Sequence, residues 1–207
     1  SLHELKIAFN LDFDGVKMTI VKDVVYKFND PVKGEVYQPF DIVPEIAVDI
    51  PSKVIIFSEF VQKEIPVKLK AYRDSIKGVL ALKVPSGWKV EPKQIDFQLF
   101  GKGEENSFSF MVTPPEGQSE GYVNPVVTIN GRAYDKSIVE INYDHIPRQL
   151  VLLPAESKVV RLNLVKKGQS IAYIKGAGDE VPTYLKQIGY EVTEIDPKSI
   201  TNNSIKD

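Results

Sequence analysis

Short segments that alternate apolar and polar residues, each closed by a turn signal, run through most of this chain and constrain its fold. In residues 5–13 every second side chain is apolar, which is the period of a half-buried strand. Asp14-Gly15 follows, a favoured hairpin turn because both positions tolerate positive φ. We expect a long return strand over 16–28, ended by Asn29-Asp30-Pro31, and then a linker-like segment. Two strands cannot bury a core alone, so residues 1–43 must pair with something else, for example as the end of an upstream β domain.

The middle of the chain, 44–147, has the strand spacing of an antiparallel β-sandwich. Turn signals recur every 8–14 residues or so with no helical period between them, which predicts an immunoglobulin-like arrangement. Asn130-Gly131 is the strongest hairpin signal in the chain. The expected strands are 45–50, 53–57, 65–72, 78–84, 94–99, 107–112, 123–129 and 133–143.

After Pro147 the pattern changes to strand, helix, strand. Strands are expected at 159–164 and 171–174, and again at 190–195. Between the last two, Asp179 is placed as an N-cap and Gly189 as a C-terminal stop. The helical stripe consists of Val181, Leu185 and Ile188. One βαβ unit leaves most of its sheet uncovered, so we expect 148–207 to be the truncated start of a Rossmann-like or amidotransferase-like α/β domain.

Charge and cysteine content exclude several partners and chemistries. The 26 basic residues are interleaved with 28 acidic ones, and this disfavours nucleic acid, which is bound by clustered Lys and Arg. No run approaches the ~18 apolar residues of a membrane span, so we expect no membrane insertion. There is no cysteine, which excludes disulfides, thiol nucleophiles and cysteine-based metal sites.

The residues needed for catalysis are sparse. Only two histidines are present, His3 and His145, too few for a zinc hydrolase site. His145 and its neighbour Asp144 are expected to be structural, at the junction of two domains. No Gly-x-Ser-x-Gly elbow occurs, and the Gly176-x-Gly178 loop lacks the third glycine of a dinucleotide fingerprint. We therefore expect no catalytic residue, no metal and no cofactor in this chain.

Aromatic residues are the remaining binding candidates. Flat apolar rings suit the C–H faces of sugars, but a stripe of aromatics also suits a core. Trp88 follows the turn Pro85-Ser86-Gly87, where it could equally cap the core on re-entry into the sandwich. Both interpretations stay open for the set, whose main members are Trp88, Tyr122 and Tyr134, with Phe100 and Tyr143 as further members.

Four segments, in this order, resemble the C-terminal half of large bacterial PIG-L/LmbE-family proteins, which are de-N-acetylase-like and typical of Bacteroidetes. They are GEVYQPF (34–40), VPSGWKVEP (84–92), YDHIPRQ (143–149) and GAGDEVP (176–182). The middle of the chain, 44–147, also looks like the β-sandwich associated with alpha-galactosidases. The region after Gly176 resembles the start of a glutamine-amidotransferase or ThuA-like domain.

This resemblance implies an exported, periplasmic or extracellular parent protein that acts on glycans and has a zinc-dependent deacetylase domain upstream. The His-Pro-Asp-Asp metal motif of that domain has no counterpart here, so no catalytic residue is carried over. The expectation is a non-catalytic accessory or spacer module whose partners are neighbouring domains of the same polypeptide. The alternatives are a carbohydrate-binding module that uses surface aromatics, or an enzyme completed by residues outside this chain.

Overall fold

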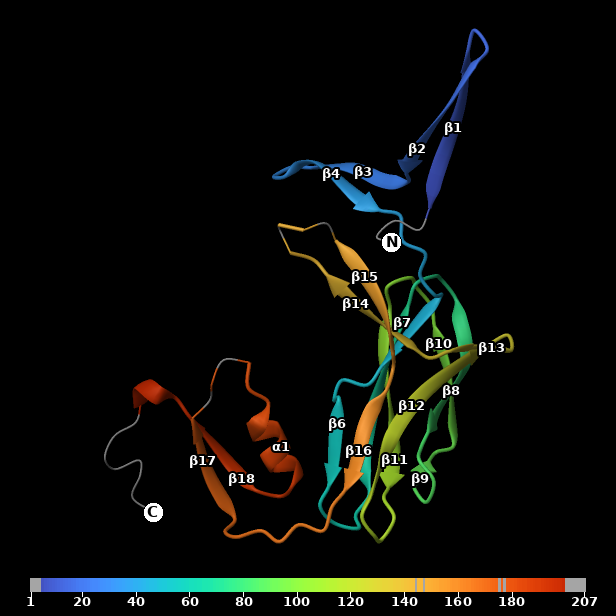
Figure 1. Ribbon diagram of the computed structural model, residues 1–207. Helices are drawn as coiled ribbons and strands as arrows, with labels where there is room; N and C mark the ends of the chain where they lie inside the picture. Colours follow the sequence, from blue (N-terminus) through green and yellow to red (C-terminus); the bar gives the residue numbers. More distant parts are fainter. Residues whose placement is uncertain (1–4, 144, 147, 175, 177, 200–207) are drawn as a thin grey trace.

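The computed structural model describes residues 5–199 except 144, 147, 175 and 177. It is mainly β with one short α-helix, as the sequence predicts, and most of its strand pairs are antiparallel. A β-sandwich forms the centre (Figure 1). Two hairpins project beyond one end of it, and a small βαβ unit lies beside one edge.

Two sheets make the sandwich. The first has the order β10 (Gln94–Leu99), β8 (Ile76–Lys83), β12 (Ser119–Ile129), β16 (Ser157–Arg161), β6 (Val54–Phe57), with β13 (Arg132–Tyr134) paired to β12. The second has the order β5 (Ile46–Asp49), β7 (Lys63–Ala71), β11 (Glu105–Thr113), β9 (Lys89–Glu91). Within these two sheets only β16 and β6 run parallel.

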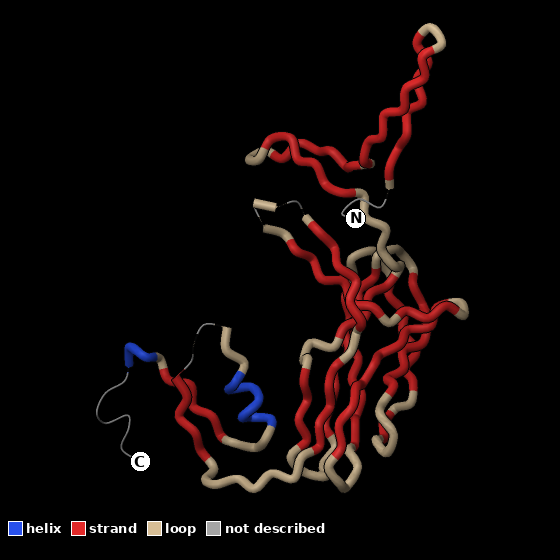
Figure 2. Tube along the Cα trace, in the orientation of Figure 1, coloured by secondary structure: helices blue, strands red, loops and turns tan. Residues whose placement is uncertain are grey.

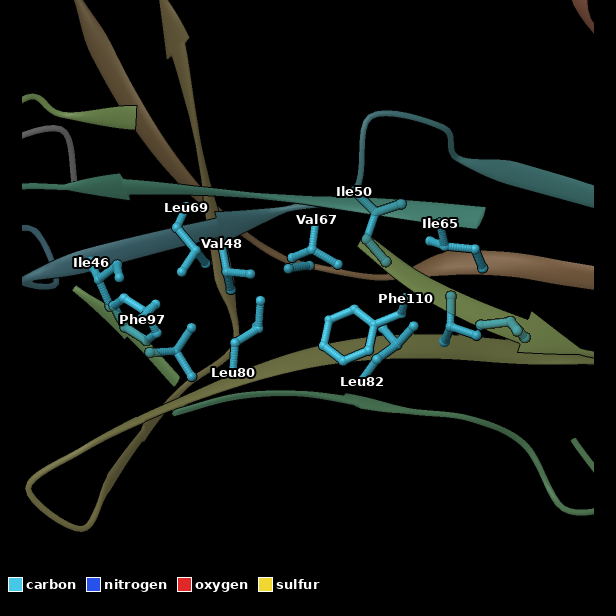
Figure 3. Close-up of a cluster of buried hydrophobic side chains, with 14 of the residues drawn as sticks. Ile46, Val48, Ile50, Ile65, Val67, Leu69, Leu80, Leu82, Phe97 and Phe110 are labelled. Atoms are coloured by element: carbon cyan, nitrogen blue, oxygen red, sulfur yellow. The ribbon is translucent and has the colours of Figure 1, made fainter. Parts of the chain in front are cut away.

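The core lies between these sheets and follows from the two-residue period of the strands (Figure 3). In β7, Ile65, Val67 and Leu69 are fully buried while the residues between them face solvent. Strands of both sheets supply the remaining buried side chains, which include Ile46, Val48, Ile50, Phe57, Ile76, Leu80, Leu82, Phe97, Leu99, Phe110, Val123, Val127, Ile129 and Val159. This closed apolar layer is complete within the chain and makes the sandwich the stable part of the molecule.

The N-terminal part confirms the predicted turn but not the strand that follows it. Asp14 and Gly15 have φ of 51° and 85°, and they join β1 (Lys6–Phe13) to β2 (Val16–Asp23). The return strand breaks at Val24, and β3 (Val25–Asp30) pairs with β4 (Gly34–Pro39) in a second hairpin. The expected linker is therefore largely a strand. The Asp30 carboxylate closes this turn by accepting hydrogen bonds from two backbone N–H groups of 32–33, each at 2.8 Å.

Residues 130–161 depart from the expected order of strands. Asn130-Gly131 forms the predicted turn, but β13 ends at Tyr134, and β14 (Lys136–Ile141) then pairs with β15 (Gln149–Pro154) in a separate hairpin. Next, β16 returns to the sandwich between β12 and β6, with Val159 fully buried. The sandwich sheet therefore contains a strand that the sequence assigned to the α/β unit. Joining the sandwich buries Val159, and this decides its place although the α/β unit follows it directly along the chain.

The C-terminal part is the predicted βαβ unit. The strands β17 (Ser170–Ile174) and β18 (Glu191–Ile195) are parallel, and α1 (Val181–Gln187) connects them (Figure 2). The predicted N-cap is one residue off: Glu180 is the N-cap and makes no side-chain cap hydrogen bond. The Asp179 carboxylate, from the position before it, accepts a hydrogen bond from the Val181 N–H at 2.9 Å. Gly189 has φ of 89° and ends the helical turn, and a short 3-10 turn, η1 (Pro197–Ser199), follows β18.

Candidate functional site

The described residues, 5–199 with four gaps, contain no group of three or more His, Asp or Glu side chains that could hold a metal ion. Within the same residues no helix is long and apolar enough to cross a membrane. His145 is exposed in the β14–β15 turn, where its ring stacks on Tyr143 with centroids 5.9 Å apart. Its position in a hairpin turn differs from the expected domain junction. Asp144 lies outside the described residues.

Trp88, the first aromatic candidate, belongs to the core. Only 6% of its surface is exposed, and its indole meets the Phe57 ring edge-on, with centroids 5.0 Å apart. Its Nε1–H donates to the Ser119 hydroxyl at 3.1 Å, which satisfies the one polar atom of the ring. A sugar cannot reach a ring face that packed side chains already cover. The interpretation of Trp88 as a core cap holds, and that of a sugar contact is corrected.

Tyr134 is tied into a polar cluster at one end of the sandwich. Its hydroxyl donates a short hydrogen bond to the Glu45 carboxylate, which also pairs with Arg73. The same hydrogen bond raises the pKa of Tyr134 above its ordinary value, because loss of the proton would set two negative charges side by side. The half-buried ring packs against the core. Tyr134 therefore fastens β13 to the chain entering β5.

Tyr122 remains as an available aromatic surface. It lies on the outer face of β12 with 53% of its surface exposed, directly opposite Lys158 of β16. The Lys158 ammonium pairs with Glu120 at 2.9 Å, which places charged groups beside the ring. Val127, the register partner of Tyr134, is five residues farther along β12, about 17 Å at the rise of a strand. The three candidates therefore do not form one platform.

A shallow hollow of about 390 Å³ lies between β14 and the outer face of β5 and β7. Lysine ammonium groups reach its rim, and neighbouring carboxylates neutralise two of them: Lys53 pairs with Asp49 at 3.3 Å, and Lys70 with Glu105 at 2.7 Å. The hydrogen bond from Lys70 lowers the pKa of Glu105, so this carboxylate is charged at neutral pH. With two of its three lining lysines paired to carboxylates, the hollow has the character of a solvated groove rather than an anion site.

The most specific polar contacts outside the strand ladders join α1 to the sandwich, over sequence separations that pattern analysis could not bridge. The Gln187 side-chain Oε1 accepts from the Ile56 N–H at 2.8 Å, on the free edge of β6. The Lys63 ammonium donates to the backbone carbonyls of Ile56 at 2.6 Å and Gln187 at 2.8 Å. It also lies over the Phe57 ring, 5.4 Å from the centroid. Burial lowers the pKa of Lys63.

The N-terminal hairpins carry the largest set of exposed apolar side chains. On β1 and β2 these include Phe9, Phe13, Val16 and Met18, all more than 40% exposed. Figure 1 shows that both hairpins stand away from the sandwich, so the core of the sandwich does not cover them. Sequence alternation correctly predicted one apolar face here but could not show whether the chain itself covers that face.

No protein-family model matches the chain, and no curated protein matches it. Among solved structures, it is similar to a family 123 glycoside hydrolase from Clostridium perfringens (8% identity, TM-score 0.37, covering 64% of this chain and 30% of that one). It is also similar to a protein of unknown function from Porphyromonas gingivalis W83 (9% identity, TM-score 0.34, covering 66% and 61%). The chain thus spans less than two thirds of either protein. Likenesses this weak carry no argument about function.

Proposed function

We propose that this chain is a non-catalytic accessory module that holds neighbouring domains of one polypeptide in fixed relative positions. The observation that carries the proposal is the joint between α1 and the β6 edge of the sandwich. A flexible linker would leave the βαβ unit free to turn, whereas two hydrogen bonds at 2.8 Å cross this joint from Gln187 to Ile56 and Lys63. The Lys63 ammonium is itself held in place within the sandwich by the Ile56 carbonyl at 2.6 Å and by the Phe57 ring.

The contact between α1 and the sandwich lies at β6, the edge strand of its sheet. An edge strand presents unpaired N–H and C=O groups that invite pairing with another chain. Here the Gln187 side chain occupies the Ile56 N–H and the Lys63 ammonium occupies the Ile56 carbonyl. One ammonium that bridges both units is a charge-assisted contact, and such contacts are stronger than neutral ones. The βαβ unit therefore protects the sandwich edge while the edge orients the unit.

The wider setting that we propose is an exported protein that acts on glycans, with a zinc-dependent deacetylase domain outside this chain. Its support is the resemblance of the segments at 34–40, 84–92, 143–149 and 176–182 to PIG-L/LmbE-family proteins. On this proposal the chain supplies placement and its neighbours supply chemistry.

The joint can be tested by replacing Gln187 with alanine and following hydrogen exchange of the Ile56 amide. We expect exchange to rise about fivefold, because a net hydrogen bond contributes about 1 kcal/mol and a factor of ten is about 1.4 kcal/mol. The control is Lys186→Ala, which removes an ion pair to Glu194 within the βαβ unit only. Equal exchange in the two variants would show that the joint does not hold the units together.

The absence of catalysis is tested separately with the intact chain, N-acetylated sugars and added zinc. We expect no release of acetate above the zinc-only background. Metal-dependent turnover that saturates with sugar would contradict the accessory role directly.

A carbohydrate-binding role is the second candidate, and the exposed Tyr122 ring beside charged and amide side chains favours it. Sugars bind where a flat apolar ring is flanked by groups that hydrogen-bond hydroxyls. Asn124, two residues along the same face, donates to Glu156 at 3.3 Å and supplies such groups. A glycan array followed by titration calorimetry tests this role. Binding lost in Tyr122→Ala but kept in Phe100→Ala, an aromatic 68% exposed elsewhere, would support it, and no binding across the array would refute it.

A further inference from the structure

The β1–β2 hairpin has two chemically different faces. In its register, directly opposite residues share a face, and the rows alternate between the two sides. One face is mostly polar: Thr19 donates to Asn10 at 2.9 Å, and Lys6 pairs with Asp23 at 3.4 Å. Ala8 and Val21 form the one apolar pair on this face. The other face is apolar apart from one lysine, and it consists of Ile7, Phe9, Leu11, Phe13, Val16, Met18, Ile20 and Lys22.

The apolar face is open to solvent. Six of its side chains, all but Leu11 and Lys22, expose between 38% and 69% of their surface. Together they present roughly 600 Å² of apolar area, the upper end of what a typical monomer leaves in one patch. A two-stranded hairpin is at best marginally stable alone and needs cover on its apolar face. An exposed apolar face on a marginally stable hairpin is what an interaction surface would present.

We propose that this face is covered by the same face of a second copy of the chain, in a homodimer of two stacked hairpins. Two such faces would bury about 1,200 Å² in total, which reaches the size of a standard specific interface. Two copies related by a twofold axis must meet through surfaces that complement themselves. The apolar face meets this requirement, because it is apolar along its length and has one charged residue near each end. This inference does not depend on the accessory role proposed above.

Charge fixes the direction of the stack. Lys22 lies at the open end of the apolar face, opposite Ile7, and Asp14 lies in the turn at the other end. In a parallel stack the two Lys22 ammonium groups would meet at one end. In an antiparallel stack each Lys22 faces the row of Val16 in the other copy, beside that copy's Asp14. The antiparallel arrangement pairs opposite charges at both ends, and we propose this one.

The association is tested on the whole chain by sedimentation equilibrium from about 1 to about 100 μM, the range where the weaker interfaces of this size dissociate. We expect a saturable monomer–dimer equilibrium. Phe9→Lys, at the centre of the apolar face, should weaken it at least about 30-fold. Thr19→Lys, at the same level on the polar face, should change it less than about twofold and is the matched control. Circular dichroism of both variants confirms that the sandwich is folded.

The direction is tested by exchanging charges. Lys22→Glu should weaken the dimer roughly fivefold, because two end pairs become repulsive, and adding Asp14→Lys should restore it. The chain has no cysteine, so single substitutions can also be crosslinked cleanly. A mixture of Val16→Cys and Lys22→Cys chains treated with a short bis-maleimide should give a thioether-linked mixed dimer, and neither variant alone should. A bifunctional reagent is used because stacked sheets lie about 10 Å apart, too far for a direct disulfide. A monomer at all concentrations, open-ended aggregation, or equal effects of Phe9→Lys and Thr19→Lys would overturn the proposal in favour of a different partner.

Discussion

Alanine at Gly78 tests how closely β8 and β12 approach one another inside the sandwich. Gly78 lies opposite Phe97 of β10, and a Cβ added there would lie 3.2 Å from the ring atom Cε1 of Phe97. It would also lie 2.5 Å from the Thr128 carbonyl oxygen and 3.0 Å from Cγ1 of Ile129. Glycine within a strand commonly marks such an approach of another backbone.

The expected loss of stability follows from those distances. Carbon–oxygen contacts are comfortable from about 3.3 Å, so the Thr128 carbonyl would have to retreat by roughly 0.8 Å and take part of β12 with it. Overpacking of a core costs about 1–3 kcal/mol, and alanine recovers about 0.4–1 kcal/mol by restricting the unfolded chain. The net change should be a loss of about 1.3 kcal/mol, or a melting temperature lower by about 3–5 °C.

Urea unfolding monitored by tryptophan fluorescence is a suitable assay, because Trp88 is the only tryptophan and lies in the same core. The matched control is Gly117→Ala, where an added Cβ meets nothing within 4 Å and φ is not positive. This control should stay within about 0.5 kcal/mol of the parent. If Gly78→Ala is as stable as Gly117→Ala, the close approach of the two strands is not a constraint and the reasoning fails.

Three further predictions concern buried or bonded side chains. Trp88→Ala should lower the free energy of unfolding by about 3–5 kcal/mol, measured by circular dichroism, and a loss below about 1 kcal/mol would mean that the indole is not part of the core. The raised pKa of Tyr134 means that its hydrogen bond to Glu45 stabilises the fold fully below about pH 10 and is lost as pH rises through the pKa of the folded state. In denaturation curves, Tyr134→Phe should flatten this alkaline loss of stability. An unchanged slope would contradict the bond to Glu45. Arg161 is 7% exposed and donates to the carbonyls of Ser58 and Leu162, so Arg161→Ala should cost about 2–3 kcal/mol in the same assay, whereas a neutral effect would show that water replaces it.

Local turn chemistry made part of this fold predictable. Asp14-Gly15 and Asn130-Gly131 form the expected turns because positive φ is a property of the two residues themselves. The sandwich and the βαβ unit were predictable from the two periods of apolar residues. The strand at Gly34–Pro39 was missed, because its turn is closed by the Asp30 side chain and not by a glycine pair.

Contacts between distant residues were beyond such reasoning. The Lys63 and Gln187 bond spans 124 positions and has no local signature. Likewise β16 follows β15 along the chain but pairs with β12 and β6. Its place is set by the gap between those two strands and not by its neighbour in the sequence. For the aromatic candidates, residue type and spacing could not separate a ring inside the core, Trp88, from a ring on the outer face, Tyr122. What separates them is which face of the sheet each side chain points to, and this depends on the register of the strand.

The placement of β16 has a mechanical consequence. The chain enters the sandwich at β5, near the end where the hairpins project, and leaves it from β16 at the opposite end (Figure 1). Tension on the two flanking segments would therefore pull β16 lengthwise against β12 and β6. Its hydrogen bonds to both neighbours would be strained together rather than opened in sequence. A strand clamped in this way should resist extension far better than one that can be unzipped from its end.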